Sequence, residues 1–120
     1  MNIGRRSRRL ERMYRSFNRA YFDNALPRNI PVAWIAGKHI SGHMAQTWKF
    51  CDGRIRIVLN QLLCEMWKKL SWSAIACNSL LHEMVHIQHQ RSAHHGPAFN
   101  KTMLRLAKDG AFRWADVSKD

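Results

Sequence analysis

Residues 80–87 read LLHEMVHI, a run in which His82 and His86 stand four positions apart and Glu83 lies between them. Residues four apart on a helix lie about 40° apart around its axis and one turn along it, so both imidazoles can face one ion. Glu83 is rotated by about 100° from His82, which suits a base acting on a water beside that ion. The run therefore predicts a helix with two zinc ligands and a catalytic glutamate.

The same five-residue pattern arises by chance in roughly one of a hundred chains with this many histidines and glutamates, where the histidines would be structural. The surrounding sequence favours a site. Apolar residues 74–76 and 80–81 precede the pattern, as expected of a buried helix at the floor of a cleft.

A catalytic zinc usually has three protein ligands and a water, so a third ligand is needed. No glutamate follows Glu83, which excludes a thermolysin-type site, and the positions of the metzincin glycine and histidine hold His89 and Ser92. His89 lies about 10 Å along the helix from His82, too far to share one tetrahedral ion. It is expected to support the site or to lie at the surface.

His94 and His95 remain as candidates for the third ligand, because the chain turns back between two helices there. The position next to Gly96-Pro97 favours His95.

The two histidine motifs together carry a resemblance. His82-Glu83-Met84-Val85-His86 followed by His95-Gly96-Pro97-Ala98-Phe99 resembles the SprT-like family, which includes the Spartan proteases and has the signature HExxH followed by HGPxF. Phe17–Pro27 is similar to the opening helix of that family, and Ile55–Asn60 to the strand before its central helices. The resemblance covers about residues 13–108.

This resemblance implies a zincin-like α+β fold, with a small antiparallel or mixed sheet packed on helices. It implies one Zn²⁺ per chain, bound by His82, His86 and His95, and Glu83 as general base. Such proteins are DNA-associated proteases that cut proteins trapped on DNA. Bacterial relatives commonly carry a C-terminal zinc ribbon, and no Cys-x-x-Cys pair occurs here, so DNA contacts are expected elsewhere.

Length and periodicity predict one domain over residues 1–120. A basic amphipathic helix is expected over about 7–24 and a β region over about 31–59, with a hairpin at Asp52-Gly53. Helices are expected within about 61–109: the first capped by Asn60, the second starting at Ser71 or Ser73 and carrying the histidines to about Gln90, the third opening at Pro97.

The net charge of +12 is concentrated at the N-terminus, where residues 1–19 carry seven arginines and one glutamate. Five of these arginines fall on the predicted outer face of the first helix: Arg5, Arg8, Arg12, Arg15 and Arg19. A solvated face is the ordinary interpretation of such a run. Without interleaved glutamates, however, the arginines repel one another, so we expect them to contact DNA.

Charged residues interrupt every apolar run, so no membrane segment is expected. The three cysteines form no Cys-x-x-Cys pair and no disulfide framework, which favours an intracellular setting in the cytoplasm, nucleoid or nucleus. The sequence makes no prediction of oligomeric state.

The leading hypothesis is a zinc endopeptidase whose protein substrate pairs with the edge of a strand over about residues 44–48. Two alternatives stay open: a non-catalytic nucleic-acid module braced by zinc, and a zinc hydrolase of non-peptide substrates.

Overall fold

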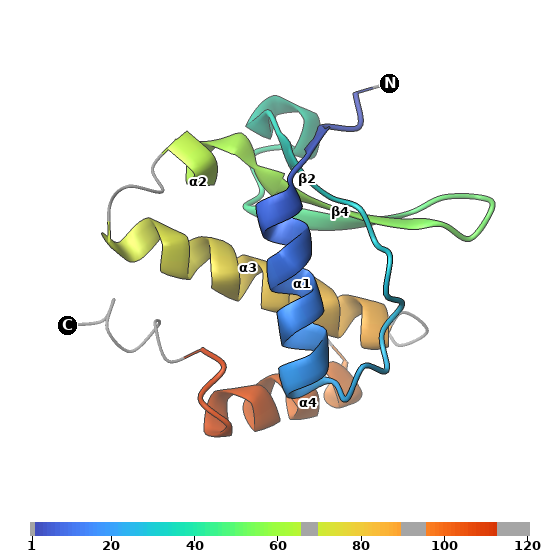
Figure 1. The fold of residues 1–120 in the computed structure, drawn as a ribbon, viewed down its shortest axis with the longest axis vertical. Helices are drawn as coiled ribbons and strands as arrows, with labels where there is room; N and C mark the ends of the chain where they lie inside the picture. Colours follow the sequence, from blue (N-terminus) through green and yellow to red (C-terminus); the bar gives the residue numbers. More distant parts are fainter. Residues whose placement is uncertain (1, 66–69, 90–95, 113–120) are drawn as a thin grey trace.

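The fold is α+β, as the sequence predicted, and consists of a four-stranded mixed sheet with helices packed against it (Figure 1). The computed structural model describes residues 2–65, 70–89 and 96–112. Its elements are, in chain order, β1 (Arg5–Arg6), α1 (Arg8–Tyr21), β2 (Val32–Ile35), the 3₁₀ helix η1 (Gly37–Ile40), β3 (Ala45–Lys49), β4 (Ile55–Asn60), α2 (Gln61–Glu65), α3 (Leu70–Gln88) and α4 (Pro97–Lys108).

The strands are ordered β1-β2-β4-β3 across the sheet. β2 and β4 run parallel, whereas β1 pairs antiparallel with β2 and β3 antiparallel with β4. The hairpin predicted at Asp52-Gly53 is confirmed: Gly53 adopts a φ of +87°, and its N–H donates to the carbonyl of Phe50 at 2.9 Å. β3 is consequently the last strand at one edge of the sheet.

The core lies mainly on the helical side of the sheet. Val32, Trp34, Ile57 and Leu59 alternate along β2 and β4 toward α1 and α3 and belong to one buried cluster. The intervening residues, Ala33, Ile35 and Val58, form a smaller cluster with Ile40 of η1 on the other side. Both faces of β2 are therefore buried, which explains its uninterrupted apolar sequence.

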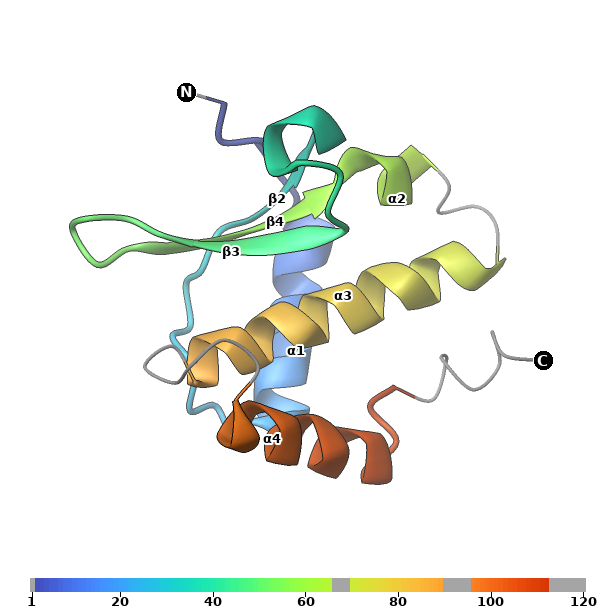
Figure 2. The same ribbon diagram turned by 180° about the vertical axis from the view of Figure 1, so that it is seen from behind.

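α1 crosses α3, whereas α4 runs roughly alongside α3 (Figures 1 and 2). In Figure 1, α1 crosses in front of α3, and α4 lies along the lower side. Figure 2 shows the opposite side, where α3 and β3 lie in front of α1. Within the part of the chain that the structure describes, no helix is long and apolar enough to cross a membrane.

α1 begins one residue after Ser7, whose side chain accepts a hydrogen bond from the N–H of Leu10 at 3.2 Å. The predicted basic face is exposed on α1 at Arg8, Arg12, Arg15 and Arg19. Arg5 requires a correction: it lies in β1, opposite Trp34 of β2, and not on the helix. The reason is that backbone pairing with β2 holds the chain extended up to the Ser7 cap.

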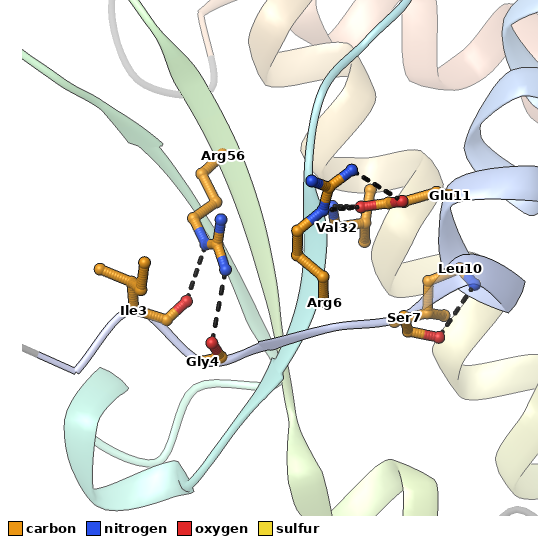
Figure 3. A network of polar contacts seen from close by, with 8 residues as sticks. All are labelled: Ile3, Gly4, Arg6, Ser7, Leu10, Glu11, Val32 and Arg56. Carbon is orange, nitrogen blue, oxygen red and sulfur yellow. Dashed lines mark hydrogen bonds and ion pairs between the residues drawn. The ribbon is translucent and has the colours of Figure 1, made fainter.

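The N-terminal segment is fastened to the sheet by the buried Arg56 of β4 (Figure 3). Its Nε donates to the carbonyl of Ile3 at 2.7 Å, and its guanidinium also reaches the carbonyl of Gly4. Gly4 has a φ of +78°, and a Cβ there would lie 2.6 Å from the Trp34 carbonyl oxygen. This tight approach requires glycine and explains how so short a strand pairs at all.

The junction between α1 and the sheet depends on Glu11, which is 8% exposed. One carboxylate oxygen accepts from Arg6 Nε at 2.8 Å and from the N–H of Val32 at 3.1 Å (Figure 3). Burial alone raises the pKa of Glu11, but the bonds from Arg6 and Val32 outweigh it, so the pKa lies below its ordinary value. The carboxylate is thus stabilised in its charged form by folding.

We expect Glu11→Ala to lower the free energy of unfolding by about 1–3 kcal/mol, because it leaves the buried Val32 N–H without its acceptor. Glu11→Gln keeps one acceptor oxygen and should cost less. Since the folded-state pKa is lowered, the stabilisation is present at neutral pH and lost as the pH falls through the range where the carboxylate titrates. Urea unfolding at pH 7 and at pH 4 measures both effects; equal stability of all three proteins would contradict this role.

Candidate metal centre

His82, Glu83 and His86 lie together in the C-terminal half of α3, with His86 in its last turn, as predicted from their spacing. The ligand atoms that these three residues offer lie within 4.8 Å of one another. Glu83 is buried, and both imidazoles are half-buried. Leu80, Leu81, Met84 and Val85 of the same helix are buried in the main core. The rigid packing of α3 therefore fixes the cluster.

The two imidazoles face each other, with 3.2 Å between His82 Nε2 and His86 Nε2. Two nitrogens bound tetrahedrally to one zinc at about 2.0–2.1 Å stand about 3.3 Å apart, so the pair fits the ion with little movement. An N–H···N hydrogen bond between the rings also suits this distance in the absence of metal. The donor set, two neutral imidazole nitrogens, is one that zinc binds readily.

Glu83 is held beside the imidazoles by Thr47 of the edge strand β3. The Thr47 hydroxyl donates to Glu83 Oε1 at 2.9 Å and lies 3.3 Å from the Glu83 carbonyl oxygen. Burial raises the pKa of Glu83 to about 7, and the hydrogen bond from Thr47 offsets only part of that increase. A carboxyl group so placed can accept and release a proton near neutral pH.

Phe99 of α4 closes one side of the cluster. Its ring centroid lies 5.2 Å from that of His82 and 4.5 Å from that of His86, and the side chain is 4% exposed. α4 starts at Pro97 with Gly96 as its N-cap. The described part of the second histidine motif, residues 96–99, is thus packed against the first motif.

Three further histidines follow the motif in the sequence: His89, His94 and His95. His89 lies outside the cluster, and its Nε2 is 2.7 Å from Thr102 Oγ1, so it links the end of α3 to α4. This agrees with its exclusion as a ligand. His94 and His95, the two candidates for the third ligand, lie outside the described residues.

A groove runs past the cluster between β3 and α3. It consists of two cavities of about 530 and 460 Å³ that share His43, Ala45, His82 and Glu83 as lining residues. The first cavity is also lined by polar side chains of β3, including Gln46, Thr47 and Lys49, whereas the second has Ile75, Met103 and Phe112 in its wall. Among the described residues, the cluster therefore lies at the junction of the two cavities.

Thr47 and Phe99 were not predicted as residues of the site. Alternation along β3 puts Ala45, Thr47 and Lys49 on one face, so the sequence contained a weak signal for Thr47 once this strand was placed beside α3. Phe99 belongs to the HGPxF motif quoted above, but its contact with the imidazoles could not be inferred from local spacing, because it joins two helices.

Comparisons of this chain with protein families, curated proteins and solved structures found no match.

Proposed function

We propose that this chain is a zinc-dependent endopeptidase of the SprT-like type that acts on proteins bound or crosslinked to DNA. The observation that carries the proposal is the position of Glu83. Its buried carboxyl group lies beside two imidazoles that face each other, at the junction of two cavities under an edge strand. A zinc site that only braces a fold has no use for a buried carboxyl group at this position.

In this proposal His82 and His86 bind the zinc, and His95 is the third ligand by resemblance to the SprT-like signature. When bound, zinc would supply Lewis-acid chemistry by acidifying a water and polarising the scissile carbonyl. Glu83 accepts the proton of the attacking water and then delivers it to the leaving amine. Thr47 keeps the Glu83 carboxyl group aimed at the groove by donating to Oε1.

The edge strand supports a peptide as substrate. β3 pairs with β4 on one side, and among the described residues no strand pairs with its other side. An extended peptide added there would hydrogen-bond to the backbone of β3 and pass over Glu83. Backbone pairing provides affinity with little side-chain selectivity, which suits an enzyme that must cut many different proteins.

The DNA part of the proposal rests on the exposed arginines of α1. Arg8, Arg12, Arg15 and Arg19 share one face of the helix. α1 is in front in Figure 1, whereas α3 and β3 are in front in the opposite view of Figure 2.

Cleavage of a DNA-binding protein, measured with and without DNA, tests the proposed function. We expect about one zinc per chain, loss of cleavage on chelation, recovery on adding zinc back, and faster cleavage when DNA carries both enzyme and substrate. A protein that does not bind DNA serves as the control substrate, and DNA should not accelerate its cleavage. If the zinc-loaded protein cleaves neither protein substrate but hydrolyses a non-peptide ester, the peptidase proposal is wrong and the chain is a hydrolase of non-peptide substrates.

A further inference from the structure

A small basic pocket lies toward the C-terminal end of α1, away from the metal centre. Its volume is about 230 Å³, and it is lined by Arg15, Asn18, Arg19, Asn24 and Arg28. Three of the five lining side chains are guanidinium groups, and none is acidic. Arg28 comes from the loop after α1 and does not belong to the arginine stripe of the helix.

The loop that carries Arg28 is held in place by buried hydrogen bonds. Asn18, which is 2% exposed, donates from Nδ2 to the carbonyl of Leu26 at 3.0 Å and accepts from the Leu26 N–H at 3.1 Å. The Tyr14 hydroxyl donates to the Pro27 carbonyl at 2.6 Å, one residue before Arg28. The position of Arg28 beside α1 is therefore set by the backbone and not by a chance contact between long side chains.

Arg15 acts through space on the Glu11 carboxylate one helical turn away, which Arg6 already pairs with, but no arginine of the pocket forms an ion pair within the described residues. The ion pairs within residues 2–65, 70–89 and 96–112 involve Arg6, Arg54 and Arg105, none of which lines the pocket. Three like charges around one concavity repel one another, and a bound anion relieves that repulsion. Arg105 also donates to the carbonyl of Tyr21 at 3.0 Å, which reduces the negative potential at this end of the helix.

The surroundings favour a nucleic acid over a membrane as the source of the anion. A helix that lies on a lipid surface presents large apolar side chains beside its basic ones. In the described part of the chain, the exposed large apolar residues are Ile3, Met44, Leu62 and Leu104, none of which belongs to α1. The basic face from Arg19 to Arg8 extends about 16 Å along the helix, enough for several phosphates of one strand.

We propose that Arg15, Arg19 and Arg28 together bind a single phosphate of a nucleic-acid backbone, and that this phosphate fixes where α1 lies on the nucleic acid. The inference rests on the DNA association within the proposed function and is independent of the peptidase activity. It adds Arg28 to the predicted DNA contacts, and it places the strongest of these contacts at the C-terminal end of α1.

Binding of the purified chain to a fluorescent DNA duplex of about 20 base pairs, measured at several salt concentrations, tests this site. Arg28→Gln should weaken binding roughly 5- to 10-fold at 0.1 M salt and reduce the slope of log K against log [salt] by about 0.9, the value for one phosphate. Arg15→Gln should do the same. Lys38→Gln, which removes an exposed cation of η1 outside the pocket, is the matched control and should change neither quantity.

The double variant Arg15→Gln/Arg28→Gln decides whether the arginines share one phosphate. If they do, its slope falls no further than that of either single variant. Additive slopes would overturn the shared site, and so would unchanged DNA binding in Arg28→Gln. A variant that loses binding of inorganic phosphate while its DNA binding is unchanged would overturn it too. Peptide cleavage without DNA is measured in parallel: normal cleavage with unchanged DNA binding would refute this site and leave the peptidase proposal standing.

Discussion

Glu83→Gln is expected to retain zinc and lose about 10²- to 10⁴-fold of the cleavage rate, the range typical of removing a general base. The amide has nearly the same shape as the carboxyl group and keeps an oxygen that can accept from Thr47, so the wall of the groove should stay in place. It cannot take up the proton of the attacking water. Single-turnover cleavage of a DNA-bound protein, with zinc content measured on the same sample, checks both parts.

The control for Glu83→Gln is Glu65→Gln, which makes the same chemical change at an exposed residue of α2. It should cleave at the parental rate. The cleavage rate of Thr47→Val should lie between those of the parent and Glu83→Gln. This variant removes the hydroxyl that orients the Glu83 carboxyl group and leaves the base itself in place. If Glu83→Gln cleaves as fast as the parent, Glu83 is not the base, and the non-catalytic interpretation of the site gains support.

The part of the fold that follows from local chemistry was predictable from the sequence. The turn at Asp52-Gly53 needs a positive φ and a side-chain acceptor, and Asp52 Oδ1 indeed accepts from the N–H of Arg54 at 3.0 Å. Asn60 caps α2 through a hydrogen bond from Leu62, as its position before an apolar run suggested. Both features involve residues fewer than three positions apart.

β1 was missed because nothing in its own two residues indicates a strand. Arg5 and Arg6 are exposed and charged, and Arg5 continues the spacing of the arginines on α1. Their pairing depends on Arg56, which is 53 positions from the carbonyl of Ile3 that it binds, and on the close approach of Gly4 to Trp34. A pattern of local periodicity cannot contain such a contact.

The candidate site likewise contains some residues that local spacing predicts and others that only packing between elements brings together. His82, Glu83 and His86 are brought together by the helix itself, so their spacing was sufficient to predict the cluster. Thr47 is 36 positions from Glu83, and Phe99 reaches the imidazoles from another helix. The residues that orient the cluster therefore depend on packing between elements, which the sequence pattern does not encode directly.

His86→Ala is expected to abolish zinc binding, because it removes one of the two imidazoles that face each other across 3.2 Å. The loss of affinity should exceed the roughly 10- to 100-fold that follows when only a residue supporting a ligand is removed. Zinc content should fall from about one per chain to a trace after dialysis, and competition with a chromogenic chelator gives the affinity of both proteins. Cleavage should fall with the zinc.

The structure provides a matched control for this variant in His89→Ala. His89 directly follows the last residue of α3, three residues after His86, but its Nε2 contacts Thr102 and is not in the cluster. His89→Ala should therefore lose some stability and keep its zinc. Because alanine at 86 also removes the ring that packs on Phe99, His86→Gln, which fills more of that space, separates loss of the ligand from loss of packing. A folded His86→Gln protein that holds zinc as tightly as the parent would show that the metal is bound elsewhere.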